Sequence, residues 1–81
     1  MTKQQIFELI KNSIREIVPE INADTVKIEQ SLRDLGVNSI DRVDIIIMTM
    51  ENLNIKMPLV EFGKLKNIDG IVDLLYEKFN G

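Results

Sequence analysis

The sequence contains no cysteine and no histidine. The chain can therefore form no disulfide and offers no thiol, and it lacks the two commonest zinc ligands. The Ser-His and Cys-His pairs of nucleophilic enzymes are excluded for the same reason. Aromatic residues make up only 5% of the chain, whereas hydrophobic residues make up 44%. We therefore expect a fold stabilised by aliphatic packing, with no metal site and no catalytic residues.

The chain has little excess of charge and no long apolar run. Ten basic and 13 acidic residues give a net charge of −3. A mildly acidic domain is a poor ligand for nucleic acid and is better suited to a basic patch on a protein partner. No run approaches the roughly 20 apolar residues of a membrane span, and no signal peptide opens the chain. We expect a cytoplasmic monomer that binds neither nucleic acid nor membrane.

The length of 81 residues favours a single domain over residues 1–81. Thr2 and Gln5 form a capping-box pair, and Pro19 ends the helical pattern, so the first helix is predicted over residues 2–18. Because the predicted helices reach both ends of the chain, we expect a free-standing protein. The other helices are predicted at about 39–53, 59–65 after Pro58, and 68–79 with Asn67 as N-cap. The expected fold is all-α, a small four-helix bundle with one short helix.

Residues 20–38 form a long connection between the first two predicted helices. Val26 and Ile28 are its expected apolar anchors, and Ser31 is expected to cap a single turn. Gly36 can adopt a positive φ and turn the chain at little cost. Loops of this length in compact domains often have a functional role.

The second predicted helix is too apolar for a single buried face. On a helical projection, one stripe contains Ile40, Val43, Ile47 and Met50, and another side contains Ile45, Ile46 and Leu53. The helix is therefore either central and buried on several sides, or it exposes one stripe for docking. Periodicity alone leaves both interpretations open.

Ser39 stands at the start of this helix. Asn38 is a good N-cap, which places Ser39 in the first turn with its hydroxyl at the positively polarised helix end. Free backbone N–H groups at such an end favour a phosphate group. Asn-Ser is also the ordinary composition of a helix start, so these residues alone do not establish a function.

The segment from Asp34 to Pro58 contains a distinctive spacing of residues. Asp34, Leu35 and Gly36 form an Asp-Leu-Gly turn, and Ser39, Ile40 and Asp41 follow at the start of the second predicted helix. The spacing continues with Val43, Asp44, Leu53, Ile55 and Pro58. This pattern resembles the acyl carrier protein family, which has an Asp-Leu-Gly turn followed by Asp-Ser-Leu at the start of its second helix. The order of the flanking helices agrees as well, so the resemblance covers nearly the whole chain.

The resemblance implies that Ser39 carries a 4′-phosphopantetheine arm, installed from coenzyme A by a phosphopantetheinyl transferase. The arm's thiol would hold an acyl group as a thioester, which makes the chain a carrier and not an enzyme. Partner enzymes that transfer or condense acyl groups would recognise the second helix. The implied partner surface is Ile40, Asp41, Arg42, Val43, Asp44, Ile47, Met50 and Glu51. On this interpretation Ile45, Ile46 and Leu53 face inward.

Three residues depart from the usual family pattern. Asn38 replaces an aspartate, Arg42 adds a positive charge, and Met50 stands where many members carry an acid. We therefore expect partner docking to depend less on bulk negative charge. The string NSIDR resembles the donor carriers of polyketide β-branching cassettes, which present acetyl to an enzyme similar to HMG-CoA synthase.

Two groups of alternatives remain from the sequence. Within the same chemistry, the chain could be a fatty-acid, peptidyl or D-alanyl carrier. In a different class, it could be an unmodified helical adaptor that binds a protein through its second helix. We expect no calcium site over residues 22–30, because the glycine and ligand spacing of an EF-hand loop are missing.

Overall fold

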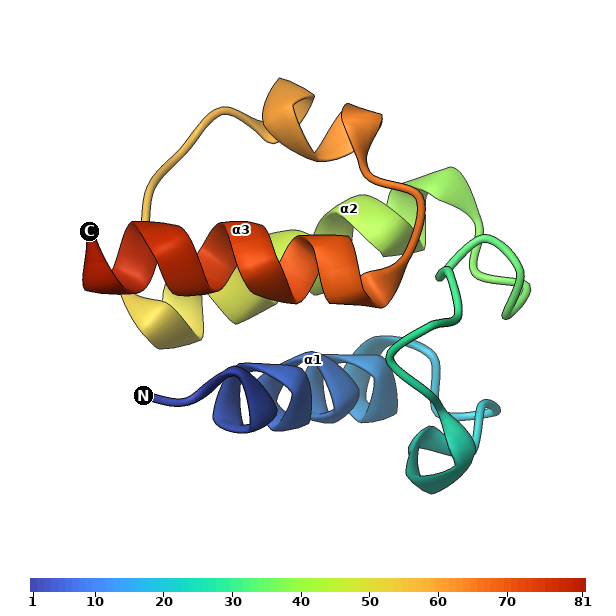
Figure 1. Ribbon diagram of the computed structural model, residues 1–81. Coiled ribbons are helices and arrows are strands. Elements are labelled where there is room, and N and C mark those ends of the chain that lie inside the picture. The colour runs from blue at the N-terminus through green and yellow to red at the C-terminus, as the bar shows by residue number, and fades with distance from the viewer.

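The computed structural model of the chain consists of helices and loops, with no strand (Figure 1). Its three α-helices are α1 (Lys3–Ile17), α2 (Ser39–Leu53) and α3 (Ile68–Asn80). Two 3₁₀ helices, η1 (Ala23–Thr25) and η2 (Leu59–Lys64), lie in the connections. The all-α prediction with one short third helix is thus confirmed. The three-residue η1 was not predicted.

The boundaries of α1 follow directly from its terminal residues. The Thr2 hydroxyl accepts a hydrogen bond from the Gln5 N–H at 3.1 Å, and the Gln5 side chain accepts one from the Thr2 N–H at 2.7 Å. This reciprocal pair satisfies two of the N–H groups that a helix start leaves free. At the other end, Val18 leaves helical geometry with φ −130°, one residue before Pro19.

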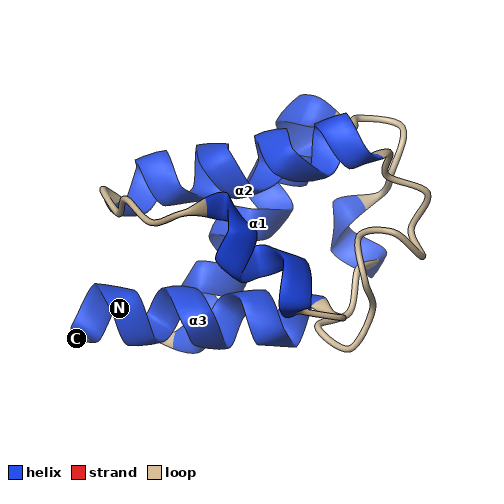
Figure 2. Ribbon diagram, turned by 90° about the horizontal axis from the view of Figure 1, so that it is seen from above, coloured by secondary structure: helices blue, strands red, loops and turns tan.

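The helix α1 packs against both α2 and α3. Figure 1 shows that α2 and α3 run in the same direction and opposite to α1, and the view from above in Figure 2 agrees. The first residues of α2 and of α3 therefore lie at the same end of the molecule, together with the long connection after α1. No helix is long and apolar enough to span a membrane.

The core between these helices is largely aliphatic, as the composition predicts, with Phe7 and Phe62 as its aromatic members. Burying each large aliphatic side chain contributes about 1.5–3 kcal/mol. Only two buried residues are polar, Ser13 and Thr49, and their hydroxyls lie 3.0 Å apart. The fully buried large side chains are Ile6, Ile10, Ile14, Ile45, Ile68, Val72 and Leu75.

The long connection between α1 and α2 is held by backbone hydrogen bonds to the start of α3. The N–H groups of Ile68 and Asp69 donate to the carbonyls of Gln30 and Ile28, both at 2.8 Å. The predicted anchors are confirmed, since Val26 is buried and Ile28 is half-buried against the core. The turn that follows leads into α2, and Gly36 has the expected positive φ of +87°. The connection thus fixes where α2 begins.

Candidate functional site

The start of α2 has the geometry that its sequence predicts. Asn38 is the N-cap, and its Oδ1 accepts a hydrogen bond from the Asp41 N–H at 2.8 Å. Ser39 is therefore the first helical residue, and its side chain is exposed. The N–H groups of Ser39 and Ile40 donate to no group of the protein. Two free donors and the positive end of the helix dipole thus surround the Ser39 hydroxyl.

A cleft of about 710 Å³ opens beside Ser39. Its α2 wall consists of Ser39, Arg42, Val43 and Ile46, which lie on one helical face because they follow the spacing i, i+3, i+4, i+7. The opposite wall comes from η2 and the segment after it, and it includes Leu59, Phe62, Leu65 and Lys66. Apolar side chains from both walls therefore line the cleft together with Ser39.

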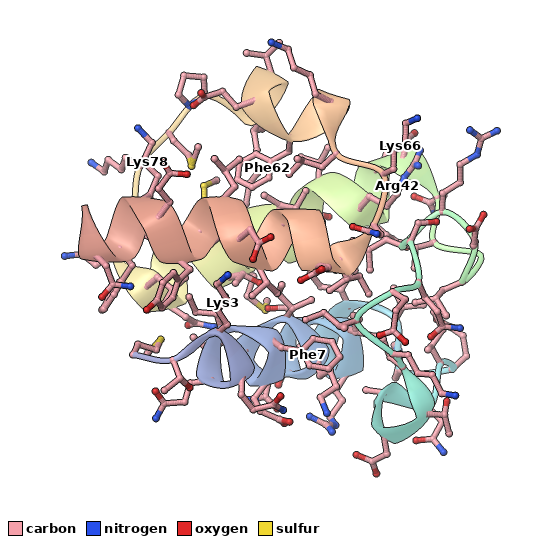
Figure 3. All side chains as sticks on the ribbon, in the orientation of Figure 1. Lys3, Phe7, Arg42, Phe62, Lys66 and Lys78 are labelled. Carbon is pink, nitrogen blue, oxygen red and sulfur yellow. The ribbon has the colours of Figure 1, made fainter.

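The charged residues that line this cleft are mostly basic. Arg33, Arg42 and Lys66 line it, against a single carboxylate from Asp34. None of these three cations forms an ion pair, since the chain's ion pairs join Lys3 to Asp73, Lys11 to Glu8 and Arg15 to Asp24. Figure 3 shows the side chains of Arg42 and Lys66 at the same end of the molecule. A chain of net negative charge thus has a local positive region at Ser39.

Two ion-paired residues with shifted pKa values lie outside the cleft. The pKa of Lys3 is raised by its hydrogen bond with Asp73, and the pKa of Glu8 is lowered by its hydrogen bond with Lys11. Neither pair lines the cleft. No group of three or more Asp, Glu, His or Cys side chains is placed to hold a metal ion. What the site offers is a hydroxyl on an open helix end.

The predicted orientation of the α2 stripes is partly wrong. Ile40 and Val43 are exposed, at 73% and 39%, and Ile45 and Leu53 are buried, all as expected. Met50, however, is only 7% exposed and belongs to the core. Ile47 and Ile46 are both half-buried, so neither is clearly outward or inward.

The error over Met50 arises because the surroundings of α2 change along its length. Met50 lies ten residues after Ile40, about 15 Å further along the helix axis. A helical projection assigns one environment to each face of the helix. It therefore cannot show that the same face is exposed at Ile40 and buried at Met50. Of the polar members of the predicted surface, Asp44 and Glu51 are exposed, and Asp41 and Arg42 are half-buried.

Sequence reasoning missed the contribution of η2 to the site. Leu59 and Val60 are 40% and 76% exposed, and Lys66 follows on the cleft wall. The adjacent apolar pair after Pro58 was the available signal, because neighbouring side chains on a short helical turn point in different directions and cannot both face the core. The part of α2 that η2 faces depends on tertiary packing and cannot be predicted from the local sequence.

Comparison with known proteins agrees with this geometry. The sequence model for the phosphopantetheine attachment site matches residues 8–75. The polyketide biosynthesis acyl-carrier-protein AcpK of Bacillus subtilis (strain 168) is 40% identical over 78 residues, which cover 96% of this chain and 95% of that protein. The chain belongs to the acyl carrier protein family. Members of this family are carriers and not catalysts, and their prosthetic group is 4′-phosphopantetheine.

Further relatives support the assignment. The acyl carrier protein of Petrotoga mobilis is 30% identical, covering 99% of this chain and 94% of that protein. A crystal structure of the curacin biosynthetic pathway HMG synthase in complex with acetyl donor-ACP also matches, with a TM-score of 0.87 and 38% identity. This match covers 96% of the present chain and 100% of the matched chain. The acyl carrier fold is thus present over nearly the whole chain.

Proposed function

We propose that Ser39 is the residue to which 4′-phosphopantetheine is attached. The chain has three serines, and the structure separates them by environment. Ser13 is fully buried, and the Ser31 hydroxyl accepts a hydrogen bond from the Asp34 N–H. Only Ser39 is exposed, and its hydroxyl makes no hydrogen bond within the protein. This contrast is the observation that carries the proposal, and a phosphopantetheinyl transferase is the partner it requires.

The surroundings of Ser39 fit the prosthetic group. The free N–H groups at the start of α2 and the cations that line the cleft favour a phosphodiester. The adjoining cleft offers an apolar wall to the group's uncharged part. When bound, the group supplies a terminal thiol that holds acyl groups as thioesters. The protein's own task is then to hold the base of the group and to present it to partners.

We propose further that residues 1–81 form one carrier domain that delivers acetyl to an HMG-synthase-like enzyme in polyketide biosynthesis. Two observations support this. AcpK, which is 40% identical, carries polyketide biosynthesis in its name. The solved structure that matches with a TM-score of 0.87 is a complex of an HMG synthase with an acetyl donor carrier.

The proposed docking surface combines α2 with η2. Its apolar part is Ile40 and Val43 on α2 together with Leu59 and Val60 on η2, all of which are exposed. Exposed apolar residues gathered beside a functional group are typical of a protein interface. Met50 is left out because it is buried. The polar part of the surface is Asp41, Arg42, Asp44 and Glu51, with Ile47 contributing the portion that is not packed against the core.

Attachment is tested by intact-protein mass after incubation with coenzyme A and a broad-specificity phosphopantetheinyl transferase. The wild type should gain the mass of one phosphopantetheinyl group, and Ser39→Ala should gain none. Ser31→Ala is the matched control, because it removes a hydroxyl from the same end of the molecule and should still be modified. If Ser39→Ala were modified, the assigned position would be wrong. If no protein gained mass while a known carrier did, the unmodified adaptor would be favoured.

Acetyl delivery is tested with the chain loaded with radiolabelled acetyl. The curacin-pathway HMG synthase, with a β-ketoacyl carrier as acceptor, should remove the label from this chain. A longer acyl group on the same chain is the control and should be retained. Loss of the longer group at an equal rate would contradict the acetyl assignment and favour a fatty-acid carrier.

A further inference from the structure

Arg42 is a half-buried cation without a partner. Its guanidinium forms no ion pair and no side-chain hydrogen bond in the structure, and the residue as a whole is half-buried. Arg42 follows Ser39 by three positions on α2, so the two side chains lie on one helical face. Side chains on a helix also lean towards its N-terminus, which directs Arg42 back towards Ser39.

Lys66 faces the same space from the opposite wall. It follows η2, lines the cleft together with Ser39 and Arg42, and likewise forms no ion pair. Figure 3 shows Lys66 and Arg42 at the same end of the molecule, whereas Lys78 lies at the other end. The two cations therefore come from different elements and line the same cleft.

We propose that Arg42 and Lys66 together bind the phosphodiester of the prosthetic group and so hold the base of the arm against the cleft. This rests on the proposed attachment at Ser39. A phosphodiester joined to the Ser39 oxygen carries one negative charge and two free oxygens. The guanidinium of Arg42 offers paired N–H donors that match two such oxygens, and Lys66 adds a compact positive charge.

The pair has a consequence for the direction of the arm. Without these cations, the positive helix end alone would favour the phosphodiester but would not select a side of α2. With them, the arm leaves Ser39 on the face of Val43 and Ile46, which line the cleft, and not towards the exposed Ile40. A docking partner would then have to displace the phosphodiester from two cations before the arm extends.

The test compares ³¹P relaxation of the phosphodiester in the modified wild type and in modified R42Q/K66Q. The matched control is K56Q/K78Q, which removes the same charge from exposed lysines outside the cleft. We expect phosphorus in R42Q/K66Q to move more freely, with transverse relaxation slower by roughly twofold. The wild type and the control should agree with each other. Added salt should bring the wild type towards R42Q/K66Q.

A second measurement uses the wild type alone, in case R42Q/K66Q is modified poorly or folds poorly. The Arg42 Nε–Hε resonance should shift between the unmodified and the modified protein, and the shift should diminish as salt is added. Equal ³¹P relaxation in all three modified proteins, or an unchanged Arg42 resonance, would overturn the phosphodiester site while attachment at Ser39 stands. Absence of any mass gain in the wild type would overturn both proposals.

Discussion

The hydroxyl oxygens of Ser13 on α1 and Thr49 on α2 lie 3.0 Å apart inside an otherwise apolar core. The Thr49 hydroxyl also lies 2.8 Å from the Ile45 carbonyl, and the Ser13 hydroxyl lies 3.1 Å from the Leu9 carbonyl. No buried side-chain nitrogen or oxygen is left without a partner. Because a one-residue slip of either helix would separate the two hydroxyls, the pair fixes the register of α2 on α1.

Removing either hydroxyl should lower the stability of the fold. Each of Ser13→Ala and Thr49→Val should reduce the free energy of unfolding by about 1 kcal/mol, the usual net value of one hydrogen bond. The double variant should cost less than the two single variants together, because the pair is lost only once. Urea titrations of all four proteins measure this coupling. Strictly additive losses would mean that the two hydroxyls do not interact.

The cap at Asn38 should contribute to stability independently of any modification. Asn38→Ala should lower the free energy of unfolding by about 1 kcal/mol, because the Asp41 N–H loses its acceptor. Asn38→Asp should retain most of this stability, since a carboxylate accepts the same bond and suits the helix dipole. Chemical unfolding of the unmodified proteins provides the measurement. Equal losses in both variants would show that the Asn38 side chain does not cap α2 in solution.

Gly36 sets the direction in which the chain enters α2. At φ +87° an added Cβ would meet no atom within 4 Å, so the cost of a side chain lies in the backbone and not in a clash. Gly36→Ala should therefore lower the free energy of unfolding by about 1–2 kcal/mol. Gly36→Asn should lose less, because asparagine tolerates positive φ better. An alanine variant as stable as the wild type would contradict this backbone geometry.

The ion pair between Lys3 and Asp73 joins α1 to α3 at 2.8 Å, and its hydrogen bond raises the pKa of Lys3 above the ordinary 10.5. A raised lysine pKa stabilises the fold below the ordinary value, and this contribution is lost as pH rises through the folded value. The difference in free energy of unfolding between wild type and Lys3→Gln should be small at neutral pH, since the Lys3 and Asp73 side chains are both exposed. This difference should shrink further in strong alkali. Parallel urea titrations at neutral and alkaline pH measure it. A difference that grows with pH would contradict the ion pair.

The sequence was informative where local chemistry decides the structure. Thr2, Gln5 and Pro19 determine the bounds of α1 through hydrogen bonds and sterics that act within a few residues. Asn38 likewise determines the first residue of α2. The position of Ser39 on an exposed helix start could therefore be predicted before the fold was known.

The cleft could not be predicted in the same way. It forms where residues near Ser31, the α2 face of Ser39 and the segment around Phe62 come together, although they are far apart in sequence. The convergence of Lys66 with Arg42 depends on the same packing. A motif thus indicated Ser39 as the serine proposed for attachment, whereas the cations beside it could be placed only from the tertiary structure.

Met50 and Ile40 provide the clearest test of which part of α2 is a surface. Met50→Ala should lower the free energy of unfolding by about 2–5 kcal/mol, because it opens a cavity in the core. Ile40→Ala should change that free energy by no more than about 0.5 kcal/mol, since the side chain is 73% exposed. In the modified protein without an acyl group, Ile40→Ala should weaken binding to the curacin-pathway HMG synthase, measured by titration calorimetry. Glu77→Ala, an exposed change on α3 outside the proposed surface, is the control and should bind like the wild type. If Ile40→Ala bound equally well, the start of α2 would not be the docking surface, whatever the outcome at Met50.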